Sequence, residues 1–492
     1  MIMLASAMAF RCTGPKEAVP EKERTPMVIC FDVEDYTSPA MAGMDDIPKW
    51  LAEIMTEEGV TGSFFVIGEK ARMMEKRGRG DVIEAMARHD IGSHTNFGSI
   101  HPTLTEILEH AGWEEGLRHM LENEGAGMDE LERIFGQRPA NLARHGGSYG
   151  PQLVAALGDL NAGYVYSPIS LPGHNAVWFC NTLNFHGEGD YGFFDDTYYR
   201  DDLFDPLLEA LDSLIPATIQ DIDVVAFFGC HPSKVRSVQF WDFNYYYGAN
   251  PGPEQWRTPE LRPLESMETA RKNFRRLVRY LRDRDDIELT TYRELADRFS
   301  DQRDSISRED LLNVAVRIFD EKKVVIDDHY SPAEIFAALA ESVVLFKRDG
   351  SLPEQLKIRR PYGPHEMPPG IPEIQLLNTG DVFLLAEEAI PVMEETNQLP
   401  PFLVREGKRI GTGSLLGLFS TLYLRINDQE LPDQMEVVPV EPYPSVNEDQ
   451  IIREVASCKS WPVHREDLDM DHLVEMTRLQ LWTLKPAWPG KH

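Results

Sequence analysis

The stretch Met27–Tyr36, with the sequence MVICFDVEDY, decides the fold of the first half of the chain. It opens with a continuous apolar run that ends at Asp32, which is typical of a β-strand buried on both faces. Gly62–Gly68 (GSFFVIG) is a second such run, and Ile47–Glu58 between them has the spacing of an amphipathic helix. Strand, helix and strand in this order predict a parallel sheet.

The same alternation continues to about residue 300. Further predicted strands are Ile91–His94, Asn141–His145, Ala162–Ser167, Trp178–Phe185, Val224–Cys230 and Ile287–Tyr292. Predicted helices between them are Val82–Arg88, Gly112–Phe135, Pro151–Leu157, Asp202–Leu214 and Met267–Arg284. We therefore predict an α/β fold over residues 27–300, and this many strands favours a distorted (β/α) barrel over a doubly wound sheet.

The rest of the chain differs in character. After a polar break at Phe299–Ser307, two amphipathic helices are predicted at Ser307–Phe319 and Ser331–Phe346, followed by a Pro- and Gly-rich connector. We expect residues 307–492 to form a smaller, mainly helical C-terminal region that binds a glycan, packs on the barrel or mediates assembly. Residues 1–26 are expected to be a disordered tail or a truncated export signal, and the compartment, cytoplasmic or extracytoplasmic, depends on which.

The charge balance excludes several classes of partner. The 492 residues include 49 Lys and Arg against 81 Asp and Glu, a net charge of −32. Nucleic-acid binding needs basic faces, so it is not expected, and neither is a polybasic membrane anchor. No apolar run reaches the roughly 20 residues of a membrane span. The 5 cysteines are widely spaced and predict neither a disulfide framework nor a zinc–thiolate site.

Acidic residues follow the first predicted strand. Asp32, Glu34 and Asp35 end an otherwise apolar run, at the carboxyl edge where parallel sheets place their sites. One carboxylate could bind a metal while another accepts a proton; the plainer interpretation is a solvated turn. Alternation along an extended chain puts Glu34 on the same face as Asp32, which favours Glu34 over Asp35 as the ligand.

Three further clusters follow other strands. His94 and His101 bracket one loop and could converge on an ion. Arg144 precedes two glycines and could hold a carboxylate ionised. His231 ends the last long apolar run, a suitable place for a general acid. A lone histidine at either place would more often be structural, whereas for the histidine pair and for Arg144 the structural and functional interpretations are about equally common.

Their order along the chain resembles the polysaccharide deacetylase family, the nodulation-type deacetylases of carbohydrate esterase family 4, in a divergent form. The resemblance covers about Met27–Phe299 and rests on Asp32 with its neighbouring acids, on Gly92-Ser93-His94-Thr95 with His101-Pro102-Thr103-Leu104-Thr105, and on Arg144 and His231. Three departures stand out. Val33 follows Asp32, Gly98 takes the usual place of the second histidine, and Gly146-Gly147-Ser148 follows Arg144 where the family has an aromatic residue and glycine.

The resemblance implies a divalent metal, most often zinc, held by two histidines and one acid. His94, His101 and either Glu34 or Asp35 would be the ligands. Asp32 would be the general base, kept ionised by Arg144, and His231 the general acid. The expected activity, within carbohydrate metabolism, is hydrolysis of a non-peptide C–N bond, such as the N-acetyl group of an amino-sugar glycan.

The substrate and the activity leave alternatives open. The aromatic loop after His231 contains Trp241, Tyr245 and Tyr246, which could stack on sugar rings or pack the loop onto the barrel. One alternative activity is that of a small-molecule amidohydrolase, similar to an allantoinase. Another alternative is a non-catalytic relative that binds glycan. The sequence does not indicate an oligomeric state.

Overall fold

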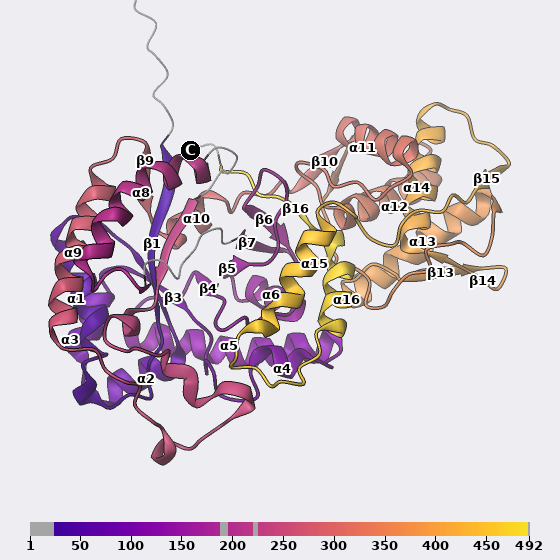
Figure 1. The fold of residues 1–492 in the computed structure, drawn as a ribbon. Helices are drawn as coiled ribbons and strands as arrows, with labels where there is room; N and C mark the ends of the chain where they lie inside the picture. Colours follow the sequence, from indigo (N-terminus) through magenta and orange to yellow (C-terminus); the bar gives the residue numbers. More distant parts are fainter. Residues whose placement is uncertain (1–23, 187–194, 220–224, 491–492) are drawn as a thin grey trace, which may run out of the picture.

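The structure is a computed structural model that describes residues 24–186, 195–219 and 225–490 (Figure 1). One sheet of ten strands forms its centre, in the order β16-β6-β7-β5-β4-β3-β2-β1-β8, with β9 paired to β1. The strands are β1 (Thr25–Val33), β2 (Ser63–Val66), β3 (Asp90–Ser93), β4 (Asn141–Ala143), β5 (Gly163–Ser167), β6 (Ala176–Phe179), β7 (Thr182–His186), β8 (Val225–Cys230), β9 (Ile287–Thr290) and β16 (Lys485–Pro486). All pairs are parallel except β6 with β7 and β16 with β6.

Helices connect the parallel strands, as the alternation along the sequence predicts. They are α1 (Asp46–Glu57), α2 (Gly68–Lys76), α3 (Gly80–Met86), α4 (Leu104–Leu108), α5 (Trp113–Phe135), α6 (Pro151–Asp159), α8 (Asp201–Ile219), α9 (Glu265–Arg282) and α10 (Tyr292–Arg298). Along β1, Met27, Ile29 and Phe31 pack in the cluster that contains the apolar faces of α1 and α9. The helices therefore cover the outer face of β1.

The other face of β1 looks into a common interior. Val28 and Cys30 share one buried cluster with Val165 of β5 and Phe185 of β7, although β2, β3 and β4 separate β1 from β5 in the sheet. Cys30 Sγ lies 3.2 Å from the hydroxyl of Tyr166. Such contacts require the sheet to curve around its interior, so the predicted α/β fold with a distorted (β/α) barrel is confirmed.

The C-terminal region is smaller and mainly helical, as predicted. Its helices are α11 (Arg308–Glu321), α12 (Pro332–Asp349), α13 (Thr379–Thr396), α14 (Thr412–Asn427), α15 (Glu448–Ser457) and α16 (Asp471–Gln480). Three two-stranded ladders accompany them: β10 (Ser305–Ser307) with β11 (Gln355–Lys357), β12 (Leu376–Asn378) with β15 (Gln434–Glu436), and β13 (Phe402–Arg405) with β14 (Lys408–Gly411). Ser307 and Ser331 accept hydrogen bonds from backbone amides at the starts of α11 and α12, which fixes where these helices begin.

The structure divides this predicted region into two parts. Residues 305–440, which we call the accessory subdomain, build most of a second hydrophobic core that also includes Trp482. Residues 448–487, the return segment, pack against α4, α5 and α6 and end in β16, which pairs with β6 (Figure 1). The two parts are joined by a buried ion pair of Lys485 with both oxygens of Glu334, at 2.8 Å each. Of the three predicted roles, packing on the barrel is observed for the return segment.

Two expectations remain, one on the N-terminal stretch and one on membrane-spanning segments. Most of the N-terminal stretch 1–26 lies outside the described residues. Within the described part, no helix has the length and apolar character needed to cross a membrane.

Candidate metal and catalytic site

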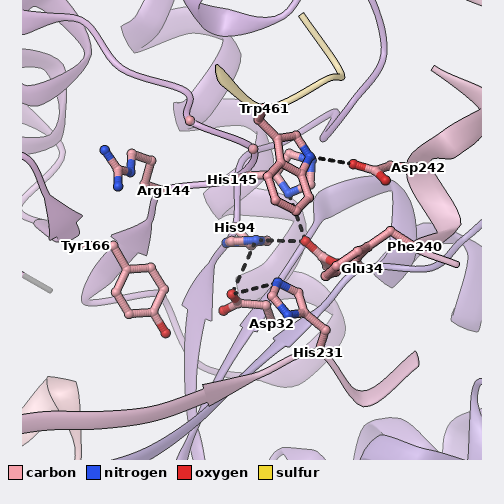
Figure 2. Close-up of a pocket in the computed structure, with 12 residues that line it drawn as sticks. Asp32, Glu34, His94, Arg144, His145, Tyr166, His231, Phe240, Asp242 and Trp461 are labelled. Atoms are coloured by element: carbon pink, nitrogen blue, oxygen red, sulfur yellow. Dashed lines mark hydrogen bonds and ion pairs between the residues drawn. The ribbon is translucent and has the colours of Figure 1, made fainter. Parts of the chain in front are cut away.

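Five of the predicted site residues gather at the carboxyl edge of the sheet because parallel strands end there together: Asp32, Glu34, His94, Arg144 and His231 (Figure 2). They surround a cavity of about 170 Å³. Its lining consists of Asp32, Glu34, His94, Arg144, His145, Gly146, Gly147, Tyr166, His231, Phe240, Asp242 and Trp461. The lining residues from Asp32 to His231 lie at or just after the ends of β1, β3, β4, β5 and β8, whereas Trp461 comes from the return segment.

Glu34, His94 and His145 are placed to hold a cation. One ligand atom from each lies within 4.8 Å of the other two, and all three residues are buried. Glu34 Oε1 is 3.2 Å from His94 Nε2 and 3.0 Å from His145 Nδ1. One carboxylate with two imidazoles is a donor set that suits Zn²⁺ and leaves positions open for water and substrate.

The outer nitrogen of each ring is held by a second partner. His94 Nδ1 lies 3.1 Å from the carbonyl oxygen of Ala143, so it donates its proton there and leaves Nε2 to face Glu34. His145 Nε2 lies 2.9 Å from Ser99 Oγ, which leaves Nδ1 facing the same carboxylate. Metal-bound histidines are generally oriented in this way, so the residues present fit a zinc site.

Trp241 holds the carboxylate itself. Its indole Nε1 donates to Glu34 Oε2 over 2.9 Å, and the indole is completely buried. Burial alone would raise the pKa of Glu34, but the charge of His231 and the hydrogen bonds from His145 and His94 outweigh it and hold the pKa well below its usual range. Glu34 is therefore anionic in the folded protein, as a metal ligand must be.

Asp32 lies beside the three candidate cation ligands, Glu34, His94 and His145, but is not one of them. Its Oδ2 is 3.9 Å from His94 Nε2 and 3.7 Å from His231 Nε2, and its buried Oδ1 has no hydrogen-bond partner within the described part of the chain. Burial raises its pKa, against the opposing charges of His94 and His231. A buried carboxylate with a free oxygen and a raised pKa is suited to accept a proton.

His231 is fixed by Asp195 on the side away from Asp32. Asp195 Oδ2 lies 2.7 Å from His231 Nδ1, and Oδ1 accepts the backbone N–H of His231 over 2.8 Å. Burial disfavours the imidazolium, but the carboxylates of Asp195, Glu34 and Asp32 outweigh this and raise the pKa of His231 to about 10. A protonated His231 with Nε2 directed toward Asp32 can serve as a proton donor.

The predicted role of His101 needs correction, because the structure does not bring it to the cavity. Its Nδ1 lies 2.8 Å from Glu106 Oε2 and its Nε2 donates to the carbonyl of Tyr245 over 3.0 Å, so both nitrogens are engaged elsewhere. Gly98, at the place usual for a second histidine, has a φ of +61° and turns the chain away. His145 stands beside His94 in its place.

Asp35 also lies outside the cation group. Its Oδ1 accepts from the backbone amides of Thr37 and Ser38 over 3.1 and 2.9 Å and so closes the turn after β1. The favoured choice of Glu34 over Asp35 therefore agrees with the geometry. The alternation of side chains along β1 is the reason, since it continues beyond the last paired residue.

Arg144 lines the cavity but does not contact Asp32 in the described structure. Its guanidinium donates to Cys458 Sγ over 3.3 Å, and Figure 2 shows it directed away from Asp32. The role predicted for it, holding Asp32 ionised, is therefore not supported by its position. The charges of His94 and His231 act on Asp32 instead.

The three predicted substrate-stacking residues are placed differently from one another. Trp241 is buried under Glu34 and is not a surface for a sugar ring. Tyr245 is buried against Tyr36 and Trp241, with ring centroids 6.3 and 6.1 Å away. Tyr246 is only partly buried, but it is not among the residues that line the cavity. The packing interpretation of this aromatic loop therefore fits Trp241 and Tyr245.

Sequence reasoning missed several residues of the site, among them His145, Asp195, Asp242 and Trp461. His145 follows Arg144 directly, at the end of a predicted strand, so its position was a usable signal. Asp195, Asp242 and Trp461 lie in segments without a strand-end pattern, and only the fold brings them to the cavity. Asp242 accepts the indole N–H of Trp461 over 2.8 Å, and burial raises its pKa to about 6 against this hydrogen bond.

Comparison with known proteins gives fold likeness only. No protein-family model and no curated protein sequence matches the chain. Among solved structures, the Puue allantoinase is 14% identical over 56% of this chain and 91% of its own, with a TM-score of 0.38. The structure titled T48 deacetylase with substrate is 15% identical over 57% and 94%, with a TM-score of 0.30.

A third solved structure is a pseudoenzyme of the CE4 family from Bacillus anthracis. It is 12% identical over 43% of this chain and 58% of its own, with a TM-score of 0.26. The similar structures thus include an allantoinase, a deacetylase and a CE4 family pseudoenzyme. Because identities and TM-scores are this low, the function must be argued from the residues of the site itself.

Proposed function

We propose that the protein is a metal-dependent hydrolase of amide C–N bonds, with the N-acetyl group of an amino sugar as its substrate. The convergence of Glu34, His94 and His145 beside an acid and a protonated imidazole carries this proposal. A zinc ion held there would supply Lewis-acid activation of the amide carbonyl and of a water molecule. All other steps fall to residues of the chain.

Asp32 accepts a proton from the attacking water, because its Oδ1 is free and its pKa is raised. The water oxygen bonds to the carbonyl carbon and the C–N bond breaks. His231 gives the leaving nitrogen its proton, while Asp195 keeps the ring oriented with Nε2 toward the cavity. The products are a carboxylic acid and an amine, so one water molecule is consumed for each amide.

A second candidate is a small-molecule amidohydrolase. The cavity of about 170 Å³ favours it, because pockets for larger ligands usually enclose 300–1,000 Å³. The two candidates share the same ligands, base and acid. They differ only in the size of the group that enters.

Metal analysis of the purified protein, followed by acetate release from N-acetylated amino sugars and small amides, tests the proposal. We expect stoichiometric metal, hydrolysis of at least one amide, and loss of activity with metal retained in Asp32→Asn and His231→Ala. His145→Ala should lose the metal and His101→Ala should keep it. A protein without metal affinity, or one that loses its metal only in His101→Ala, would refute the site.

A further inference from the structure

The return segment closes one side of the candidate site. We call residues 457–465 the strap, since they lie between α15 and the later part of the return segment and reach the cavity. Trp461 lines the cavity and donates its indole N–H to Asp242 over 2.8 Å. Its ring meets that of Phe240 edge-on at 5.2 Å, and Phe240 in turn lies 4.7 Å from the ring of His231. The strap is therefore a wall of the catalytic cavity.

Several contacts fix the strap to the loops around the site. The carbonyl of Pro462 accepts the backbone N–H of Tyr247 over 2.7 Å. The backbone N–H of Arg465 donates to Glu106 Oε1 over 3.0 Å. A Cβ on Gly147 would lie 2.0 Å from the carbonyl oxygen of Cys458, so the strap backbone is in direct contact with the cavity loop. A substrate therefore cannot extend through this side of the cavity, and the cavity volume of about 170 Å³ favours a small or chain-terminal group.

Arg144 brings a positive charge to this cavity. Its described side-chain contact is with Cys458 Sγ, a weak acceptor, and no carboxylate oxygen of the described residues lies within 4.0 Å of the guanidinium. The nearest acidic influence on the guanidinium is the more distant charge of Glu454. Glu454 in turn faces His186, with Oε2 3.7 Å from His186 Nδ1. Among the described residues, Cys458 Sγ is the one acceptor found for the five N–H groups of the fork, so most of these groups can bind a ligand or water.

Most other titratable groups of the cavity face an opposite charge; Asp242 is the exception and accepts the neutral indole N–H of Trp461. His231 is paired with Asp195, and Glu34 and Asp32 face the two histidines and the proposed cation. Arg144 is only partly buried and lines this partly open cavity, and its planar fork matches a carboxylate. Because Arg144 directly precedes the ligand His145, such a carboxylate would be held close to the reacting amide.

Resting on the proposed function, we infer that the substrate is a small or chain-terminal amide that carries a carboxylate, which Arg144 binds. The same anion could belong to an acidic sugar or to an N-acylated amino acid. In either case the amide C–N bond is hydrolysed as above, and the carboxylate takes no part in bond making.

The test compares substrates that differ only in this charge. One pair is the C6-uronate of N-acetylglucosamine against N-acetylglucosamine, and the other is N-acetylglycine against N-acetylglycinamide. A hydrogen-bonded charge contact corresponds to about 10- to 150-fold in binding, so we expect kcat/KM to favour the charged member of one pair by at least about 10-fold. That pair also identifies the source of the anion.

In Arg144→Met the preference should fall to about one, mainly through KM, and Arg144→Lys should restore part of it. Arg317→Met, the same change on α11 in the accessory subdomain, where the guanidinium pairs with Asp327, should keep the preference. Equal losses for charged and neutral members in Arg144→Met would overturn the inference, because Arg144 would then only support the strap. So would an undiminished preference in Arg144→Met, since the carboxylate would then bind elsewhere.

A binding measurement separates this inference from the proposed function. Zinc-loaded Asp32→Asn is titrated calorimetrically with the four compounds, with and without Arg144→Met. Charge-dependent binding that needs Arg144 supports the inference even if no amide is turned over. Hydrolysis of both pairs with no charge preference refutes the inference and leaves the proposed function standing.

Discussion

Replacing Trp241 by Phe should weaken metal binding without touching a ligand. The indole N–H donates to Glu34 Oε2 over 2.9 Å, while Oε1 faces the two histidines. Phe removes this donor but keeps an aromatic ring in the completely buried position. Glu34 then loses the contact that fixes its orientation, and its second oxygen stays buried without a partner.

The size of the effect follows from the charge of the acceptor. A hydrogen bond to a charged group contributes about 1.5–3 kcal/mol, and loss of such a partner of a metal ligand usually lowers affinity by about 10- to 100-fold. The two figures agree, because about 1.4 kcal/mol corresponds to a factor of ten. We expect the Kd for Zn²⁺ to rise by this factor in Trp241→Phe.

Competition with a chromophoric chelator at fixed pH measures this Kd, and thermal unfolding of the metal-free proteins checks the fold. Trp256→Phe is the matched control, because its indole N–H donates to the carbonyl of Pro251 over 3.2 Å and its ring packs on Tyr36 in the same aromatic cluster. Equal zinc affinity in wild type and a folded Trp241→Phe would refute the reasoning. An equal loss in Trp256→Phe would show that packing, not the hydrogen bond, is responsible.

Three other changes test the site and the fold. Asp195→Asn should lower the pKa of His231, so the alkaline limb of the activity profile, where the proton donor is lost, should move down by about 1–3 pH units, as a pH series of kcat would show. Lys485→Met leaves the buried Glu334 with only Arg360, whose Nε lies 3.2 Å from Oε1, as a charged partner, and should lower the free energy of unfolding in urea titrations by less than the about 3–5 kcal/mol expected for a wholly unpaired buried charge. Burial raises the pKa of Glu124 from 4.5 to about 8, against the backbone hydrogen bond from Asn96. Between these two pKa values the folded protein keeps a proton on Glu124 that the unfolded chain releases. The free energy of unfolding therefore falls as the pH rises from 4.5 to about 8, by about 1.4 kcal/mol per pH unit at most. In Glu124→Gln this part of the slope should vanish from unfolding curves measured between pH 5 and 8.

Each of these three predictions has an outcome that would contradict it. An unchanged alkaline limb in Asp195→Asn would mean that His231 is not the proton donor. If Lys485→Met combined with Glu334→Gln were as unstable as Lys485→Met alone, the incompletely paired charge of Glu334 would not be the cause. A slope in Glu124→Gln equal to that of the wild type would assign the pH dependence to other groups.

The sequence led to the site where backbone periodicity controls side-chain position. Asp32 and Glu34 are two residues apart at the end of β1, so alternation alone puts both on the cavity side. His94 and His231 directly follow β3 and β8, and parallel strands end at one edge. These residues could be predicted because an extended strand leaves little freedom in where the next side chain points.

Prediction failed where loops decide. His101 follows His94 in a spacing that suggested a second ligand, yet the loop carries it to Glu106 and the carbonyl of Tyr245. The aromatic residues after His231 invited a sugar-stacking role, whereas Trp241 turns inward to Glu34. A loop has no fixed period, so nothing in its sequence states which way a histidine or a tryptophan points.

By itself, the sequence determined the α/β fold and the edge of the sheet at which carboxylate and imidazole side chains meet. Hydrophobic periodicity is local, and the chain records it residue by residue. Only the tertiary structure decided that His145 completes the cation group, that Asp195 orients His231, and that the strap around Trp461 closes the cavity beside Arg144. These contacts join segments up to hundreds of residues apart, and the packing of the return segment onto the barrel, which no local pattern encodes, brings the strap to the site.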